Sequence, residues 1–471
     1  MENNKKNPIP FQKQTAGVQT MLGAPRKAII KLSIPMIVAM SVHTLYTFID
    51  AIWVSGLGAD ALSAVGFFFP FLFMLMALAT GLGVGGGSAV SRRIGAHDKS
   101  GADQVAAHTI VLMVITAIAI AVPCFIAAPQ IFTAMGAGHI VPLATTYARI
   151  LFAGTLIYFF SNIANALMRA EGDVKRAMVA MMFGGGLNIV LDPIFIYVLK
   201  LGVPGAAWAT LISMTVSSAM LFYWLSIKKV TFISLFLRHF RFRKTIVKDI
   251  YRVGIPASVQ QLAMAIVAFL FNLLCVRVGG TDGVAVYTVG WRVTMFAVLP
   301  MFGIATAVTS VTGAAFGGNA YPKLNTAYMY AVKVGVCIEL AAGVLTFIFA
   351  PQIAALFTLS QEAVRIRADL IIFLRTICFF YPAAAFGIVS SAMFQGTGKG
   401  LYALIVTLVR TIFLAVPLAH TFALVMNLGL SGIWWGIVAG NILGSAVAFT
   451  WGRQFVRGLM SGKHSPIAEN V

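Results

Sequence analysis

Asp50, Asp192 and Glu339 are the acidic residues that lie well inside apolar stretches of this sequence. A charge inside a bilayer costs on the order of 2.5 to 3.5 kcal/mol even on lenient insertion scales, so each of the three is a candidate for function. A buried carboxyl group can bind a proton, and two carboxylates with other oxygen donors can hold a hard cation such as Na⁺. Asp50 and Asp192 carry most weight, whereas Glu339 fits a structural role equally well.

Other polar residues share helix faces with the two aspartates. Tyr46 precedes Asp50 by one helical turn and His43 precedes it by about two. Asn188 precedes Asp192 by four residues, so an amide and a carboxylate look into the same space. Thr210, in a later apolar stretch, offers a further oxygen ligand if its side chain faces inward. The predicted cation site, for H⁺ or Na⁺, comprises Asp50, Asn188, Asp192 and Thr210.

Two prolines mark points where helices are expected to bend. Pro193 follows Asp192 directly and cannot donate a backbone hydrogen bond, so it frees the carbonyl of Ile189. Pro35 lies at the start of the first apolar stretch. Both prolines are predicted hinges.

Composition predicts an all-α integral membrane protein. Hydrophobic residues make up 59% of the 471 residues and charged residues only 10%, with a mean hydropathy of +0.91. Soluble proteins carry roughly a quarter charged residues, and a run of about 20 apolar residues is enough to span a bilayer. The twelve predicted spans are residues 28–54, 61–90, 104–128, 140–169, 176–200, 204–227, 249–276, 284–315, 325–350, 362–394, 401–425 and 430–456.

The net charge of +20 falls in alternate connections between the spans. Residues 228–248 hold a dense group of lysines and arginines, and residues 54–61 and 128–140 hold none. This alternation follows the positive-inside rule and predicts that both termini and the central connection are cytoplasmic. The spread of the charge over several connections argues against a nucleic-acid-binding protein, which would need its basic residues clustered.

Short motifs recur in the two halves at a nearly constant offset of 221 to 227 residues. Ile34-Pro35 recurs as Ile255-Pro256, and Leu201-Gly202 recurs as Leu428-Gly429. Each repeat has six spans, so the halves are predicted to form two bundles related by a pseudo-twofold axis, with a central cavity between them. The predicted organisation is a cytoplasmic tail (1–27), an N-half bundle (28–227), a basic cytoplasmic linker (228–248), a C-half bundle (249–456) and a second tail (457–471).

The acidic residues break this symmetry. The counterpart of Asp50 falls near Phe271 or Asn272, and that of Asp192 falls within Leu414–Leu418. Neither region is acidic. A requirement of the scaffold should have persisted in both halves, so the asymmetry favours an ion site in the first half.

No enzyme is expected from this sequence. It contains no His-Glu-x-x-His motif and no visible pair of nucleophile and base. The cysteines lie singly in apolar stretches, which indicates buried small hydrophobic residues and not disulfides or metal ligands. They are Cys124, Cys275, Cys337 and Cys378.

Six motifs taken in order resemble the multidrug and toxic compound extrusion (MATE) transporters, in the branch called DinF-like. The motifs are Pro35, Ile49-Asp50 with Gly56–Gly66, Asn162, Asn165–Asp173, Asn188–Pro193 and Gly205–Thr210. The resemblance covers nearly the whole chain, and it implies that the N-half carboxylate network is the cation site. Another branch carries acids in spans 7 and 10, whereas residues 260–269 and 379–385 hold none here, which argues against C-half coupling. The expected substrate cavity is lined by His43, Tyr46, Tyr147, Asn162, Asn165 and Met214.

The resemblance implies a secondary active antiporter that exports cationic or amphipathic small molecules by alternating access, with H⁺ or Na⁺ as the coupling ion and no cofactor. We expect small-molecule substrates and membrane lipids as partners, no nucleic acid, and a monomer in the inner membrane of a prokaryotic cell. The alternative is a lipid-linked oligosaccharide flippase of the same superfold, since Arg292 and Arg410 could hold a pyrophosphate in the cavity.

Overall fold

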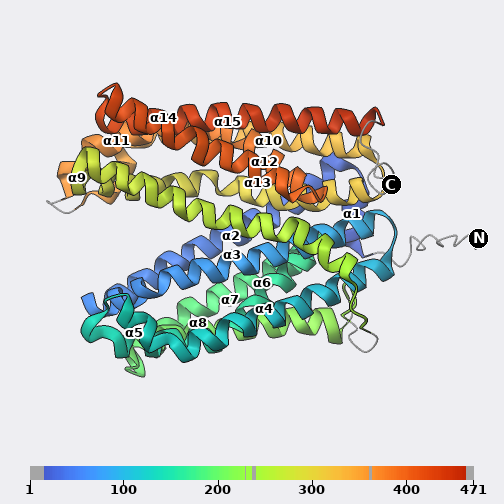
Figure 1. The fold of residues 1–471 in the computed structure, drawn as a ribbon, viewed down its shortest axis with the longest axis horizontal. Helices are drawn as coiled ribbons and strands as arrows, with labels where there is room; N and C mark the ends of the chain where they lie inside the picture. Colours follow the sequence, from blue (N-terminus) through green and yellow to red (C-terminus); the bar gives the residue numbers. More distant parts are fainter. Residues whose placement is uncertain (1–14, 229, 236–239, 360–362, 463–471) are drawn as a thin grey trace, which may run out of the picture. The chain divides into compact units, whose positions relative to one another are not determined.

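The computed structural model describes residues 15–228, 230–235, 240–359 and 363–462, and all regular elements within these ranges are helical (Figure 1). Among them, ten helices are long and apolar enough to cross a membrane, and a pair bent by 47° at Gly154 supplies another span. The helix α9 (Lys244–Gly317) has 74 residues and breaks at Gly280, where φ is 59°. A straight helix of that length would measure about 110 Å against a bilayer core of about 30 Å, so α9 supplies two spans. The prediction of twelve spans is confirmed.

The helices of the first half, in chain order, are α1 (Ala16–Leu22), α2 (Pro25–Ser55), α3 (Ala59–Gly95), α4 (Lys99–Ala134), η2 (Gly138–Ile140), α5 (Val141–Ala153), α6 (Thr155–Ala170), α7 (Val174–Pro193), η3 (Ile194–Val198), α8 (Gly202–Phe222) and η4 (Tyr223–Ile227). After α9, the second half comprises α10 (Tyr321–Phe357), η5 (Ala363–Ile366), α11 (Arg367–Ile377), η6 (Cys378–Phe380), α12 (Tyr381–Gly396), α13 (Gly400–Leu408), η7 (Val409–Ala415), α14 (Val416–His420), η8 (Thr421–Val425) and α15 (Gly429–Met460). The turns η3, η4, η7 and η8 are π-helical.

Several helices begin or end outside the predicted boundaries. The segment predicted as tail contains the helix α1, and α2 begins at Pro25, before residue 28. The predicted linker overlaps α9, which begins at Lys244, while Lys229 and Arg238 lie outside the described residues. Most spans also extend beyond their apolar runs, as α4 does to Ala134, because helical hydrogen bonding continues past the hydrocarbon layer. Of the predicted tails 1–27 and 457–471, residues 1–14 and 463–471 lie outside the described residues.

The chain divides into two compact units. Unit 1 contains residues 15–23 and Val38–Ser258, and unit 2 contains Ala24–Ile37 and the residues from Val259 onward. Of the three divisions, those after Ile37 and after Ser258 fall inside helices, and each lies two residues after a proline of the repeated Ile-Pro motif, Pro35 in α2 and Pro256 in α9. The motif thus coincides with two of the points at which the chain passes from one unit to the other.

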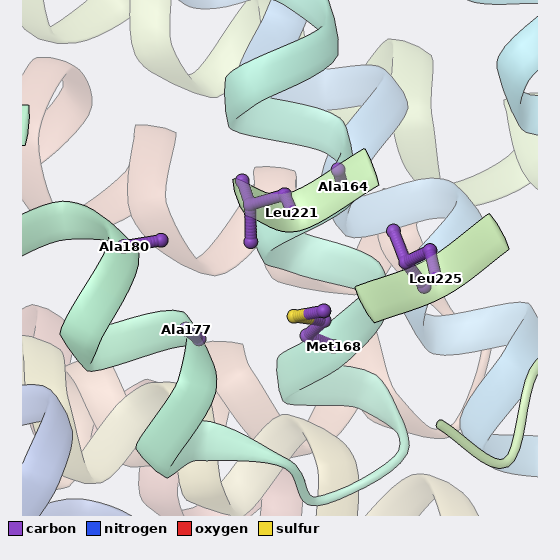
Figure 2. Close-up of a cluster of buried hydrophobic side chains, with 6 residues drawn as sticks. All are labelled: Ala164, Met168, Ala177, Ala180, Leu221 and Leu225. Carbon is purple, nitrogen blue, oxygen red and sulfur yellow. The ribbon is translucent and has the colours of Figure 1, made fainter. Parts of the chain in front are cut away.

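Small residues let the helices of unit 1 pack closely. Figure 2 shows the side chains of Met168, Leu221 and Leu225 beside three alanines of α6 and α7. All six side chains are fully buried. Because an alanine side chain ends at Cβ, the α6 and α7 backbones can approach Leu221 of α8 and Leu225 of η4 without leaving a void. The cluster comprises Ala164, Met168, Ala177, Ala180, Leu221 and Leu225.

Candidate cation and substrate site

Two carboxyl groups from different helices meet inside unit 1. Asp50 lies in the last third of α2 and is half-buried, and Asp192 lies at the end of α7 and is fully buried. The two side chains approach closely enough for a hydrogen bond. Two ionised carboxylates have no donor between them, so such a contact requires either a shared proton or a bound cation. The structure therefore brings together the two aspartates on which the sequence analysis placed most weight.

Asn188 completes one side of this pair. Its Nδ2 donates to Oδ1 of Asp192 at 3.2 Å, as the spacing of four residues predicts. Oδ2 of Asp192 is buried and accepts no hydrogen bond from the residues described. A buried acceptor without a donor carries a desolvation cost of about 1 to 3 kcal/mol, so this oxygen is suited to a proton or a hard cation.

The end of α2 is fastened to the turn that follows Asp192. Pro193 closes α7, and the next five residues form the π-helical turn η3. Within this turn the hydroxyl of Tyr197 donates to the backbone carbonyl of Trp53 at 2.6 Å. A Cβ at Gly56 would lie 2.3 Å from that hydroxyl, so any larger residue there would displace the Tyr197 hydroxyl. This contact holds the helix that carries Asp50 against the helix that carries Asp192.

Aromatic side chains extend the site along α2. The Tyr46 hydroxyl lies 3.3 Å from Nε2 of His43, and their rings meet edge to face with centroids 4.8 Å apart. The Tyr46 ring covers Gly185 of α7, where a Cβ would lie 2.9 Å from it. Tyr147 of α5 is an electrostatic neighbour of both carboxyl groups, Asp50 and Asp192. Three of the predicted cavity residues thereby lie around the aspartate pair or within about two helical turns of it: Tyr147, Tyr46 and His43.

The structure does not bring Asn165 to the pair. It is buried at the far end of α7, where its Nδ2 donates to the carbonyl of Ala177 at 3.0 Å and its Oδ1 accepts from Arg169. Fifteen residues of α7 separate Ala177 from Asp192, which is about 22 Å along a helix. The amide of Asn165 therefore serves the packing of α6 on α7.

Asn162, Thr210 and Met214 are all half-buried. Asn162 donates from its Nδ2 to the carbonyl of Tyr158 within α6 at 2.9 Å. Thr210 and Met214 lie one turn apart on α8, and the Thr210 hydroxyl makes no hydrogen bond to any residue the structure describes. The structure shows no contact that joins Thr210 to the aspartate pair.

Two residues near the site were missed by the sequence analysis. Gly185 accommodates the Tyr46 ring, and Tyr158 of α6 is an electrostatic neighbour of Tyr46. The run Gly184–Gly186 gave a signal for close packing, but a glycine does not reveal which side chain will fill its space. Tyr158 gave none, because a tyrosine inside an apolar span resembles ordinary packing.

The sequence analysis also missed a buried carboxyl group in the connection that follows α6. Glu171 follows α6 and is fully buried, and its Oε2 accepts from the backbone N–H of Ile233 at 2.8 Å. Burial raises the pKa of Glu171 to about 8, and the nearby Asp173 acts in the same direction. Beside it, Oδ1 of Asp103 accepts from the N–H of Ser234 at 2.8 Å. These carboxyl groups fasten the connection after η4 to the bundle.

Unit 2 has a different set of interior polar groups. Glu339 of α10 is fully buried, and both of its carboxyl oxygens lack a hydrogen-bond partner among the described residues. Arg410 of η7 packs against Gly387 and Gly444, where a Cβ would lie 2.8 Å and 2.4 Å from atoms of Arg410. No acidic side chain of the described chain pairs with Arg410. The interior of unit 2 thus holds an isolated acid and an isolated base.

Comparison with known proteins gives a consistent result. The family model MatE matches residues 35–194 and again residues 256–421, once in each half. The multidrug export protein MepA of Staphylococcus aureus (strain MSSA476) is 26% identical over 419 residues, covering 88% of this chain and 91% of the relative.

Solved structures are more similar. An outward-facing multidrug resistance MATE family transporter of the MOP superfamily is 50% identical, with a TM-score of 0.93 over 95% of this chain and 100% of the other. A MOP superfamily transporter from Pyrococcus furiosus, described as having a binding pocket of reverse polarity that suggests a different function, is also 50% identical, with a TM-score of 0.91 over 95% and 99%. The double match to the family model and the agreement in fold show that this chain belongs to the MATE family of multidrug efflux transporters.

Proposed function

We propose that the protein is an antiporter that exports cationic or amphipathic small molecules in exchange for H⁺ or Na⁺ by alternating access. Asp50 and Asp192 bind the coupling ion, and Asn188 orients Asp192. Pro35 and Pro193 act as hinges. The protein acts in the inner membrane of a prokaryotic cell with both termini in the cytoplasm, in keeping with the distribution of lysine and arginine between its connections.

The single observation that carries this proposal is the pairing of the two carboxyl groups. Asp192 is fully buried and has one oxygen without a donor, and its carboxyl group lies within hydrogen-bond reach of that of Asp50. Such a pair gains a proton or Na⁺ in one state of the transport cycle and loses it in another. Binding of the ion is thereby linked to the spacing of α2 and α7.

Transport into or out of proteoliposomes tests the proposal when pH and sodium gradients are imposed separately. Export that follows the pH gradient alone identifies H⁺ as the coupling ion, and export that follows sodium alone identifies Na⁺. Asp192→Asn keeps the shape and removes the charge, so it should reduce gradient-driven transport to background.

Asp60→Asn is the matched control, because Asp60 is an exposed aspartate of the same unit, 3.3 Å from Nε2 of His139. Normal transport by Asp60→Asn alongside background transport by Asp192→Asn supports the assignment. Equal transport by both variants contradicts it.

One observation favours a second candidate, a flippase for lipid-linked oligosaccharides. Arg410 is an interior arginine with no acidic partner in the described residues, and guanidinium groups bind phosphates in bidentate fashion. The reversed pocket polarity attributed to the relative from Pyrococcus furiosus points in the same direction. Binding of matched cationic and anionic dyes separates the two functions: preference for the cation supports efflux, and preference for the anion supports the flippase.

A further inference from the structure

An open apolar groove lies on the surface of unit 1, and none of its lining residues belongs to α2 or α7, the helices that carry the aspartate pair. It encloses about 440 Å³, within the range of small-molecule sites in proteins. Several lining side chains are largely exposed, among them Ile126 (64%) and Ile118 (51%). The groove is lined by Ala117, Ile118, Ala121, Val122, Phe125, Ile126, Phe152, Ala153 and Leu156. All lining residues belong to α4, α5 and α6.

An arginine is held at one end of this groove. Nε of Arg149 donates to the backbone carbonyl of Phe125 at 3.2 Å, and the guanidinium lies over the Phe125 ring, 5.4 Å from its centroid. That carbonyl is available because Pro129, four residues later, has no N–H to donate to it. No carboxylate of the described residues pairs with Arg149, so its two terminal nitrogens remain able to bind an anion.

The position of Arg149 along α4 matches the depth of lipid phosphates. The 36 residues of α4 measure about 54 Å, so about 12 Å of helix extends past each side of a 30 Å hydrocarbon core when the helix is centred. Phe125 lies nine residues, or about 14 Å, from the Ala134 end of α4. Arg149 therefore sits near the boundary between hydrocarbon and headgroups, and the groove runs from there to Ala117, near the bilayer midplane.

We propose that this groove binds one anionic phospholipid, whose phosphate pairs with Arg149 and one of whose acyl chains lies along α4 from Phe125 to Ala117. The apolar lining accepts the chain, and the guanidinium fork accepts two phosphate oxygens. A net anionic lipid is favoured over a zwitterionic one because the headgroup of the latter brings its own cation.

The repeat supplies an internal control for this site. Arg375 and Phe347 of unit 2 stand 226 and 222 residues after Arg149 and Phe125, and their guanidinium and ring are likewise 5.4 Å apart. The counterpart of Ala153 is Phe379, whose ring packs on Phe347 with centroids 6.3 Å apart. An aromatic ring thus occupies in unit 2 the place that a small residue leaves open in unit 1.

Native mass spectrometry of delipidated protein titrated with phosphatidylglycerol tests the proposal, with phosphatidylcholine as the zwitterionic comparison. We expect one lipid to bind tighter than the rest. Arg149→Gln should weaken it about tenfold, as loss of a charge-assisted pair predicts. Ala153→Phe, which copies unit 2, should weaken it similarly, and Arg375→Gln should leave it unchanged.

Three outcomes overturn the proposal. Equal binding by all variants shows ordinary annular lipid, and weakening by Arg149→Gln without weakening by Ala153→Phe shows a headgroup contact outside the groove. Competition between phosphatidylglycerol and tetraphenylphosphonium for the same site shows a substrate groove. If Ala153→Phe fails to fold, Ala121→Leu fills the groove instead. It should weaken the binding of phosphatidylglycerol as Ala153→Phe is expected to do. None of these outcomes depends on which residues bind the coupling ion.

Discussion

The two units share a backbone plan in detail. Residues with positive φ recur at the repeat offset: Gly202 at 59° and Gly429 at 60°, Lys200 and Asn427 at 54° each. In both units a π-helical turn ends two residues before the first of these positions: η3 ends at Val198, before Lys200, and η8 ends at Val425, before Asn427. These positions lie in the left-handed region, which glycine adopts freely and lysine and asparagine do not, so the repeat has preserved the same backbone geometry at equivalent connections.

The units differ in the polar and charged side chains at equivalent positions of this shared backbone. The α7 span of unit 1 carries Asn188 and Asp192, whereas residues 400–425, the equivalent span of unit 2, hold Arg410 and no acid. The π-helical turn of unit 1 carries Tyr197, which donates to Trp53, and its counterpart Leu424 has no hydroxyl. The comparison teaches that the shared plan is structural and that the features present once are the candidates for function.

Removing the aspartates should have the largest effect. We expect Asp50→Asn and Asp192→Asn each to reduce gradient-driven export to background, with normal expression. Arg410→Gln in unit 2 should retain export, because the coupling ion binds in unit 1. Transport in proteoliposomes measures both. Loss of export in Arg410→Gln with retention in Asp192→Asn would reverse the roles assigned to the units.

The number of carboxyl groups predicts electrogenic exchange. One charge moving through about 100 mV is worth roughly 2.3 kcal/mol, and a tenfold ion gradient about 1.4 kcal/mol. One-for-one exchange of a monovalent cation cancels the electrical part and leaves about tenfold accumulation. Strong export of such a substrate therefore needs more than one coupling ion, and Asp50 with Asp192 can supply two charges.

Transport in proteoliposomes under an imposed membrane potential tests whether the exchange is electrogenic. We expect export of a monovalent cation to rise with the potential. Export that ignores the potential would show one-for-one exchange, with the second carboxyl group serving to position or tune the first.

Glu171 should make the stability of unit 1 depend on pH. Its pKa is about 8 in the folded protein because of burial and about 4.5 as a free side chain, so it contributes stability that is present below about pH 4.5 and is lost as pH rises through 8. Its counterpart in unit 2, Thr397, cannot titrate. Between pH 5 and pH 9 the free energy of unfolding should fall more for wild type than for Glu171→Gln, by ~2–4 kcal/mol. Thermal unfolding at each pH measures this difference. Parallel curves would place the pH dependence elsewhere.

Tyr197→Phe should have the smallest effect. The substitution removes the hydrogen bond from Tyr197 to the Trp53 carbonyl, and this loss should lower the free energy of unfolding by about 1 kcal/mol. The resulting side chain lacks a hydroxyl, as does Leu424 at the equivalent position of unit 2. Because that bond holds α2 against η3, the variant should also show weaker ion binding at the aspartate pair. Tyr223→Phe is the control, since Tyr223 is exposed and donates no hydrogen bond to the described residues. Equal midpoints of thermal unfolding in the two variants would show that the bond contributes nothing.

The sequence by itself determined the number of spans, the repeat and the two aspartates. Apolar runs need about 20 residues to cross a bilayer, and an acid inside such a run stands out from its neighbours, so Asp50 and Asp192 are visible without a structure. The same information could not fix the break at Gly154, because an apolar run continues through it and glycine is common in membrane helices.

Only the tertiary structure decided which polar residues meet. Asn165 and Asn188 look alike in sequence, yet one serves the packing of α6 on α7 and the other contacts Asp192. Asn165 bonds to Ala177, which lies 11 residues, or about 16 Å, before Asn188 along α7. The anchoring of Arg149 also depends on a carbonyl of another helix, freed by Pro129. Contacts between helices depend on rotation and crossing geometry, which periodicity within one helix does not specify.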